Sequence, residues 1–350
     1  MNKLNKKLII PLIILLIIAT SFTVFASELQ VHFIDIGQGD AILIQTPEDK
    51  NMLIDGGDRF NWVADRLTGY LEEQNVSTVH AIVGTHPHAD HIGGLPAVIE
   101  NFEVEKVYDS GRVHTTKTYE DYLRLIDRKD ILFHTPRRGE NIQLGELNFA
   151  VLHPGSGVER YSLNNASIVL HLEYGDISFL FTGDVEKEAE KEILASDFDL
   201  EATVLKVAHH GSSSSTIPEF LEEVNPEVAV IQLGEDNRYG HPHDEVLERF
   251  KSSGVDVYRN DKHGNIVVKT DGDTYTINAD IEADIVQAKI NINIASKAEL
   301  QELGGVGAAI AERIIEYREN VGSFERIEDI KKVNGIGSGR FEEIKDEITI

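Results

Sequence analysis

The chain has 350 residues, of which 41% are hydrophobic, and this is enough for one large globular domain and a smaller one. Its formal net charge of -27 at pH 7 opposes long-range attraction of nucleic acid, so any contact with DNA must depend on local features. The absence of cysteine excludes disulfide partners and a lipid anchor, so stability must come from an apolar core and from bound metal.

The chain begins with the pattern of a signal peptide. "MNKLNKK" is basic, "LIIPLIILLIIATSFTVF" is apolar, and "VFA" ends at Ala26 with small residues near the spacing of a cleavage site. The alternative is an uncleaved membrane anchor, since the apolar run is close to the length of a membrane span. Either way we expect residues 27–350 to be exported to the cell envelope or the medium, with no other membrane segment.

Residues 27–278 alternate between strand and helix patterns. "LQVHFIDI" reads as a strand, "NWVADRLTGYLEEQ" as an amphipathic helix over 61–74, and 92–100 as a further helix. A hairpin is expected around Tyr174-Gly175-Asp176. Strands and helices in this order predict sheets sandwiched by helices. Residues 279–290 read as a linker, and residues 291–350 read as a small, nearly all-helical domain.

The stretch "THPHADHIGG", residues 85–94, gathers metal-binding side chains at the end of a predicted strand. His86 and His88 are two residues apart, so on an extended backbone both point to the same side. Asp90 and His91 follow at the start of the next helix. One loop can thus supply ligands to two neighbouring ions, and imidazole with carboxylate suits Zn²⁺, Mn²⁺ or Fe.

Further ligands are expected at the ends of other strands. "FTGD" places Asp184 after an apolar strand, where its carboxylate could bridge two ions. "VLKVAHHG" places His209 and His210 at another strand end. One of the two histidines is expected to bind metal and the other to contact substrate or support a ligand. The choice stays open, with His210 favoured because it directly precedes a Gly-Ser turn.

These motifs resemble the metallo-β-lactamase superfamily. T-H-P-H-A-D-H is similar to its HxHxDH signature, Asp184 stands at its bridging aspartate, and His209-His210 stand at its last ligand position. Over residues 29–278 the chain more closely resembles the hydrolase domain of the ComEC competence proteins, through "VHFIDIGQGDAILIQTPEDKNMLIDGG", "NNASIVL", "HHGSSSST" and "YGHPHDEV". The resemblance implies an αββα sandwich and two divalent metal ions, Zn²⁺ or Mn²⁺.

One ligand position departs from the superfamily pattern. Where a third histidine usually precedes the bridging aspartate, this chain reads "SLNNASIVL". We expect Asn165 to take that position, with Asn164 and His153 as alternatives. A neutral amide is a weak ligand and would favour Mn²⁺ over Zn²⁺.

Four further polar residues complete the predicted site. The resemblance implies that Asp55, in "LIDGG", orients a ligand histidine, and that Asp35 and Asp40 support the site. Turn formation is the alternative for Asp35 and Asp40. His241, in "YGHP", resembles a pocket residue that contacts a phosphate or protonates a leaving group, although it could also be an ordinary loop histidine. We expect Asp90 to orient the attacking water, so Asp90 and His241 are the predicted catalytic residues.

A glycine-rich motif occurs twice in the C-terminal region. "LGGVGAAIAERI" and "VNGIGSGRFEEI" each open an amphipathic helix, as in a helix–hairpin–helix unit. Their backbone amides suit a phosphate, without regard to base sequence. Residues 291–350 resemble the DNA-binding domain of the ComEA competence receptors, and the alternative is a protein-interaction module. The predicted DNA-binding glycines are Gly305, Gly307, Gly335 and Gly337.

The C-terminal region is itself acidic, with eight Lys or Arg and twelve Asp or Glu in residues 291–350. DNA binding would therefore depend on the hairpin amides and on a few local cations, and it should be weak and sensitive to salt. The predicted cationic contacts are Lys331, Lys332 and Arg340.

Together these features predict an exported metal-dependent nuclease or phosphodiesterase related to competence, with DNA held by the C-terminal module. Two alternatives remain at this stage. One is an exported hydrolase of a non-nucleic substrate, such as a cell-wall phosphodiester or a lactam, because the expected ligands alone do not select a substrate. The other is a DNA receptor without catalysis.

Overall fold

We analysed a computed structural model of the protein, which describes residues 28–235, 237–282, 289–345 and 347–350. The predicted signal segment, residues 1–26, lies outside the described residues. Within the described part of the chain, no helix is both long and apolar enough to cross a membrane.

The first sheet has eight strands in the order β17-β16-β1-β2-β3-β5-β7-β8. β3 pairs with β5, β5 with β7 and β7 with β8 in parallel, while the remaining neighbours are antiparallel. In that order the strands are Tyr275–Ala279, Ile266–Thr270, Leu29–Phe33, Ile42–Gln45, Asn51–Ile54, Ala81–Gly84, Lys106–Asp109 and Leu132–His134.

The second sheet has seven strands in the order β15-β14-β13-β12-β11-β10-β9. β12 to β15 run parallel, and β11 and β12 form the hairpin predicted around Tyr174-Gly175-Asp176. In that order the strands are Asp256–Arg259, Val228–Ile231, Val204–Lys206, Ile177–Phe181, Val169–Tyr174, Leu147–His153 and Asn141–Leu144.

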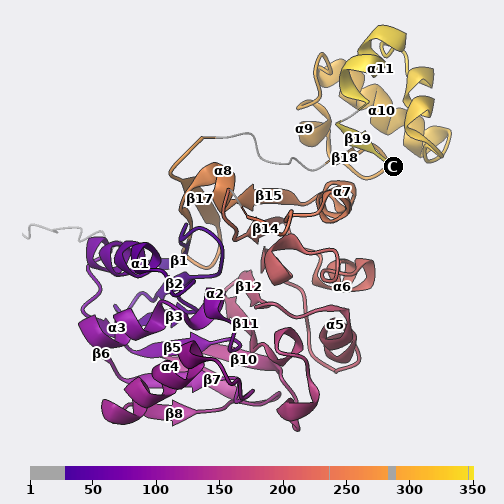
Figure 1. The fold of residues 1–350 in the computed structure, drawn as a ribbon. Helices are drawn as coiled ribbons and strands as arrows, with labels where there is room; N and C mark the ends of the chain where they lie inside the picture. The colour runs from indigo at the N-terminus through magenta and orange to yellow at the C-terminus, as the bar shows by residue number, and fades with distance from the viewer. Residues whose placement is uncertain (1–27, 236, 283–288, 346) are drawn as a thin grey trace, which may run out of the picture.

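Three apolar clusters divide the larger part of the chain into four layers (Figure 1). The first lies between the sheets and contains alternate residues of facing strands, such as Phe33 of β1 and Phe179 of β12. The second lies between the first sheet and helices α1 (Asn61–Glu73), α3 (Leu95–Asn101) and α4 (Lys117–Arg128). The third lies under α5 (Lys187–Leu194), α6 (Pro218–Val224) and α7 (Asp244–Ser253). The predicted αββα sandwich is confirmed.

The helix predicted over 92–100 is broken in the structure. A one-turn helix, α2 (Ala89–Ile92), ends before Gly93, and α3 begins at Leu95. A Cβ atom at Gly93 would lie 2.3 Å from the Arg59 backbone nitrogen, and one at Gly94 would lie 2.1 Å from the Gly56 carbonyl oxygen. Because neighbouring backbone presses against both positions, the two glycines hold α2 close to the end of β3.

The remaining elements of the sandwich are short. β4 (Thr78–Val79) pairs with β6 (Glu103–Val104), and α8 (Asn260–His263) precedes β16. Three 3-10 turns, η1 (Val158–Arg160), η2 (Asn164–Ala166) and η3 (Ala208–Gly211), lie in the loops of the second sheet. η2 and η3 carry residues of the predicted site.

The C-terminal region has its own apolar core, which includes Leu300, Ile314 and Phe341. It contains α9 (Lys297–Leu300), α10 (Ala308–Asn320), the 3-10 turn η4 (Ile327–Lys332) and α11 (Ser338–Ile344). Two short parallel strands, β18 (Ile290–Asn291) and β19 (Ile348–Thr349), join its two ends. Apart from this strand pair, which the helical pattern did not indicate, the predicted small helical domain is confirmed.

Candidate metal centre

The candidate metal centre lies where strands of both sheets end. β5 leads to His86 and to α2, which carries Asp90 and His91. On the other sheet, β12 leads to Asp184, and β13 leads to η3 with His210. The side chains of His86, His91, Asp184 and His210 are almost completely removed from solvent. Ligand-type groups that are far apart in the sequence therefore meet in one buried place.

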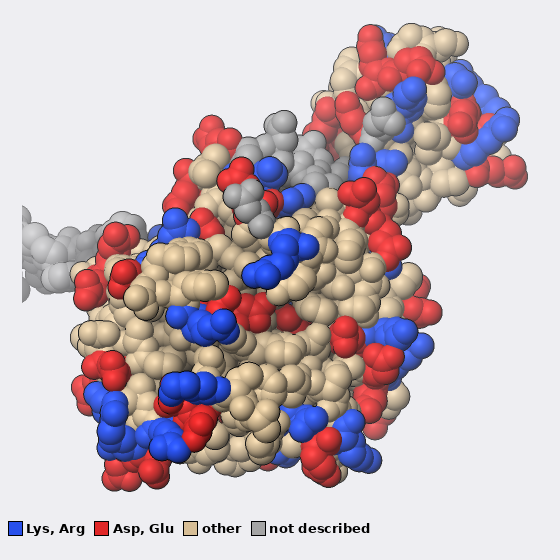
Figure 2. Space-filling view, viewed as in Figure 1, with Lys and Arg blue, Asp and Glu red and all other residues tan. Residues whose placement is uncertain are grey.

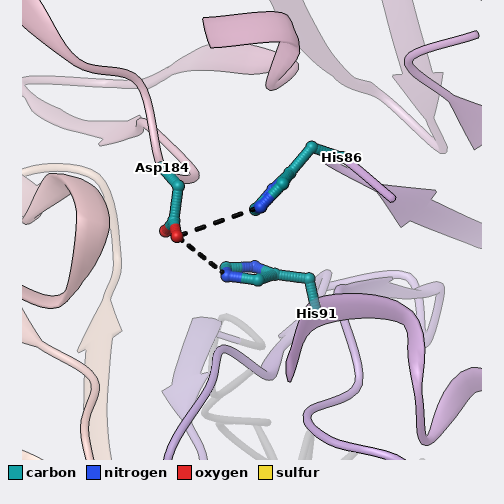
Figure 3. Close-up of side chains that lie close together, drawn as sticks. All are labelled: His86, His91 and Asp184. Atoms are coloured by element: carbon teal, nitrogen blue, oxygen red, sulfur yellow. Dashed lines mark ion pairs between the residues drawn. The ribbon is translucent and has the colours of Figure 1, made fainter. Parts of the chain in front are cut away.

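Asp184 faces three imidazole rings. Its Oδ2 atom lies 3.2 Å from His91 Nε2, 3.5 Å from His210 Nε2 and 3.9 Å from His86 Nε2. Figure 3 shows His86 and His91 approaching this carboxylate from the opposite sheet. The arrangement places one carboxylate oxygen between nitrogen atoms from two loops, which is the position expected of a bridging ligand.

Two overlapping groups of three could each hold a cation. His86, His91 and Asp184 form one group and Asp90, His91 and His210 form the other, with ligand atoms within 4.8 Å of one another in each. His210 Nε2 lies 3.6 Å from Asp90 Oδ2. His88 lies beside them, since its Nδ1 is 2.9 Å from His86 Nε2. The structure thus brings together all four predicted residues of the 85–94 loop.

Several buried nitrogen and oxygen atoms in this cluster have no hydrogen-bond partner. They include His91 Nε2, His210 Nε2 and Asp184 Oδ1. A buried polar atom without a partner costs free energy, so such atoms are expected to bind something. Imidazole nitrogen and carboxylate oxygen suit Zn²⁺, Mn²⁺ and Fe, and the residues present therefore fit a divalent cation.

Asp55 lies directly behind His91, on the side away from Asp184. Its Oδ2 accepts a hydrogen bond from His91 Nδ1 at 2.7 Å, and its oxygens also accept from Thr85 N at 2.8 Å and Thr85 Oγ1 at 2.6 Å. The bond keeps a proton on His91 Nδ1, so Nε2, which faces the cluster, is the atom that would bind a metal ion.

The structure distinguishes the two adjacent histidines of η3. His210 is buried, its Nδ1 donates to the Gln232 carbonyl at 2.9 Å, and its Nε2 faces the cluster. The His209 side chain is 22% exposed, and its Nε2 lies 3.9 Å from Asp184 Oδ2. Both residues have positive φ, 50° for His209 and 54° for His210, which is uncommon for residues other than glycine. This backbone directs His210 inward and leaves His209 at the mouth.

Asn165 does not face the cluster. Its Oδ1 accepts hydrogen bonds from Glu186 N at 2.8 Å and Ala189 N at 3.4 Å, so it caps the start of α5. His153 is also directed elsewhere, because its Nε2 donates to the Asn165 carbonyl at 2.7 Å. The Asn164 amide nitrogen Nδ2 instead lies 3.4 Å from His209 Nε2, and the buried Oδ1 of Asn164 has no hydrogen-bond partner. The geometry therefore favours Asn164 over the predicted Asn165.

The two remaining aspartates have different positions. Asp35 accepts from Gly37 N at 3.0 Å and lies 3.2 Å from Arg66 Nη1, so it shapes a turn and is not brought into the cluster. Asp40 is buried, and its Oδ1 lies 3.4 Å from His210 Nδ1. Asp40 also forms an ion pair with Lys206.

Lys206 is a residue of the site that sequence reasoning missed. It ends β13, is 1% exposed, donates to the Gly183 carbonyl at 3.2 Å and lies 4.0 Å from Asp184 Oδ1. The signal in the sequence was a lysine at the end of the apolar run "VLKVA", since buried lysines are rare unless paired. Its ammonium group neutralises part of the negative charge beneath the cluster.

The charged groups of the cluster shift the pKa values of one another. Burial alone would raise the pKa of Asp184, but His91 and His210 outweigh it and hold that pKa well below its usual range. Burial alone would lower the pKa of His210, but Asp184 and Asp40 outweigh it and raise the pKa to about 10. Groups that favour a proton on His210 also favour a metal ion in place of that proton.

His241 lies at the mouth of the centre. Its ring centroid is 5.6 Å from that of His209 and 6.4 Å from that of His210, and its buried Nδ1 has no hydrogen-bond partner. Burial and the neighbouring histidines lower its pKa to about 4. His241 is therefore neutral at pH 7, which suits contact with a substrate better than the predicted donation of a proton to a leaving group.

The glycine hairpins of the C-terminal region pack against each other. Gly305 and Gly335 have positive φ, 73° and 107°. Gly307 and Gly337 directly precede α10 and α11, so the first amides of both helices follow the hairpins. Arg340 donates to the Gly335 carbonyl, and a Cβ atom at Gly305 would lie 2.8 Å from Arg340 Nε.

The predicted cationic contacts of this region have partners within it. Arg340 joins the two hairpins, Lys332 pairs with Asp329 at 2.9 Å, and Lys331 lies 4.5 Å from the centre of the Phe341 ring. Arg313, which the sequence did not single out, donates to the Asn334 carbonyl at 2.9 Å. The cations thus support the hairpins as well as adding positive charge there.

Comparison with known proteins agrees with this geometry. Residues 34–235 match the family model of the metallo-beta-lactamase superfamily, and residues 286–349 match that of the helix-hairpin-helix motif. ComE operon protein 3 of Bacillus subtilis is 34% identical over 257 residues, which cover 69% of this chain and 33% of that protein. Competence protein ComA of Neisseria gonorrhoeae is 29% identical over 247 residues, covering 68% of this chain and 32% of that protein.

The C-terminal region has a separate relative. ComE operon protein 1 of Bacillus subtilis is 56% identical over 63 residues, which cover 18% of this chain and 31% of that protein. The chain therefore spans about a third of the length of each of these competence relatives.

Proposed function

Because the chain belongs to the metallo-β-lactamase superfamily and carries a helix-hairpin-helix motif, we propose that it is an exported metal-dependent nuclease related to competence. The observation that carries the proposal is the presence of both parts in one chain. One part gathers unpartnered buried imidazole and carboxylate atoms, and the other presents glycine hairpins suited to phosphate. The competence relatives of both parts support a role related to competence.

Six side chains would hold two divalent cations in this proposal. They are His86, His88, Asp90, His91, Asp184 and His210. When bound, such ions activate water and stabilise negative charge on a phosphoryl group. The Asn164 amide oxygen would add a seventh, neutral ligand of the kind that Mn²⁺ accepts more readily than Zn²⁺, so we favour Mn²⁺.

The residues around the cluster have distinct roles in hydrolysis. Asp90 has a side chain that is 25% exposed, so its carboxylate reaches the solvent side, where it can orient the attacking water. His209 and His241, at the mouth, contact the phosphodiester. Water adds to phosphorus, the bond from phosphorus to the leaving sugar oxygen breaks, and the proton lost by the attacking water passes through the surrounding solvent to that oxygen.

The C-terminal module holds DNA through its backbone in this proposal. The amides that follow Gly307 and Gly337 open α10 and α11 and point toward an anion. Such contacts do not distinguish base sequences. Because the region has eight basic and twelve acidic residues, binding is weak and falls steeply with salt.

Cleavage of DNA by the purified chain from residue 27 onward tests the proposal. Linear DNA is incubated with the protein and Mn²⁺, Zn²⁺ or a chelator, beside an Asp184→Ala variant. Metal-dependent cleavage that the variant lacks supports a nuclease. A gel shift without cleavage under any metal indicates a receptor, and hydrolysis of a lactam or a cell-wall phosphodiester without cleavage of DNA indicates a different substrate.

A further inference from the structure

Exposed aromatic side chains gather beside the metal centre. Among the described residues, four Phe, Trp or Tyr side chains are exposed, namely Phe60, Trp62, Phe133 and Tyr239. Phe60, Trp62 and Tyr239 are 47%, 51% and 56% exposed, and all three lie next to loops of the centre. Phe133 lies on β8, the edge strand of the first sheet. Exposed rings grouped in this way are typical of a binding surface.

Trp62 and Phe60 adjoin the loops that carry Asp90 and His91. A Cβ atom at Gly37 would lie 2.6 Å from the Trp62 ring, and one at Gly39 would lie 2.1 Å from the Asp90 carbonyl oxygen. The short segment 37–39 therefore touches the tryptophan at one end and the metal loop at the other. The segment before α1 also contacts the metal loop directly, because the backbone of Arg59, next to Phe60, lies against Gly93.

Tyr239 lies in the loop after β14, which packs against the same segment 37–39, since a Cβ atom at Gly234 would lie 2.8 Å from the Gln38 backbone nitrogen. Its ring stacks on His241 with the centroids 5.7 Å apart and the planes 25° from parallel. The His241 ring in turn lies 5.6 Å from that of His209. Aromatic rings thus lie beside the centre in two neighbouring groups, one joined to the first sheet and the other to the loops of the second.

Positive charge accompanies the first group of rings. The Arg59 guanidinium lies 6.0 Å from the centre of the Phe60 ring, and the Arg66 guanidinium lies 5.8 Å from that of Trp62. In Figure 2, acidic side chains lie in the middle of the viewed face and basic side chains lie around them. Arg66 also pairs with Asp35 at 3.2 Å, so Arg59 is the cation whose position beside exposed rings favours a ligand that combines flat rings with negative charge.

We propose that these rings stack on unpaired bases of single-stranded DNA next to the phosphodiester held at the metal centre. Single-stranded DNA offers the required chemistry, since each free base has a face that stacks on an aromatic side chain and each linkage carries a negative charge. A duplex conceals these faces between its base pairs. The inference rests on the proposed nuclease function and adds its substrate class.

The fluorescence of Trp62 provides a local test, because it is the one tryptophan of the chain. The metal-loaded protein is titrated with a short phosphorothioate-linked strand, which resists cleavage, then with an abasic strand of the same length, and with the duplex. We expect the single strand to quench the fluorescence and the other two to leave it nearly unchanged. A lack of quenching, or equal quenching by the abasic strand or the duplex, would overturn the inference.

A pair of matched variants extends the test to affinity. Trp62→Ala should raise the Kd for the single strand about 5- to 100-fold, whereas Phe133→Ala, which removes an exposed ring on the edge strand, should leave it unchanged. Equal Kd values for the two variants would contradict the proposal. Quenching without cleavage under any metal supports the stacking surface and overturns the nuclease function, and cleavage without quenching does the reverse.

Discussion

Replacing Asp55 with asparagine tests how the metal centre is held in place. The two oxygens of Asp55 accept from His91 Nδ1 at 2.7 Å, Thr85 N at 2.8 Å and Thr85 Oγ1 at 2.6 Å. Asparagine has one oxygen, and the fixed backbone amide of Thr85 will retain it. The NH₂ group must then face His91 Nδ1, so the proton of His91 moves to Nε2 and removes the lone pair that faces Asp184.

The loss of this support should weaken metal binding about 10- to 100-fold, or ~1.4–2.7 kcal/mol. The affinity is measured by competition with a chromophoric chelator, with circular dichroism to check the fold. Asp35→Asn is the matched control, because it makes the same change at an aspartate that accepts from Gly37 and pairs with Arg66 outside the cluster. The reasoning fails if the Asp55 variant binds metal as tightly as the Asp35 control.

Three further predictions follow from the contacts of the cluster. Burial opposes a proton on His210 and on His91, yet the surrounding aspartates raise the pKa of His210 to about 10 and that of His91 well above its usual value in the metal-free protein. A bound metal ion displaces a proton from each ring, so metal affinity measured by calorimetry should rise by at least about tenfold per pH unit between about pH 7 and 9. The proton on His210 also adds to the unfolding free energy of the metal-free protein. This addition is complete below about pH 6.5 and is lost as the pH rises through about 10, which urea unfolding at several pH values should show. Lys206→Met removes the ammonium group that pairs with the buried Asp40 and should cost about 3–5 kcal/mol of unfolding free energy, part of which Asp40→Asn restores in the double variant. Asn165→Ala should lower the unfolding free energy by about 1–2 kcal/mol and leave metal affinity unchanged. Asn164→Ala should instead lower metal affinity and leave the unfolding free energy of the metal-free protein unchanged.

Much of the arrangement could be predicted because it depends on local patterns. Apolar runs that end in polar residues mark strand ends, and parallel strands bring such ends to one edge of a sheet. His86 and His91 follow such a strand end in the first sheet and Asp184 follows one in the second, and the resemblance of their motifs to the metallo-β-lactamase signature predicts that the two ends meet. The repeated glycine hairpins are equally local signals, since each needs a few glycines directly before a helix.

The features that could not be predicted depend on contacts between distant segments. Asn164 and Asn165 are neighbours in a 3-10 turn, and only the position of α5 determines which amide is used as a cap. Gly93 interrupts a predicted helix because the backbone of Asp58 and Arg59 lies against it. Lys206 looks like the ordinary end of a strand until Asp40, far away in the sequence, is found beside its ammonium group.

Metal titration with simultaneous measurement of cleavage tests the central claim most directly. Metal-free protein is titrated with Mn²⁺, and bound metal and the initial rate of DNA hydrolysis are measured on the same samples. The account predicts a rate that rises with occupancy toward two ions per chain, and both signals should be lost in Asp184→Ala. Full occupancy without hydrolysis of DNA would contradict the account.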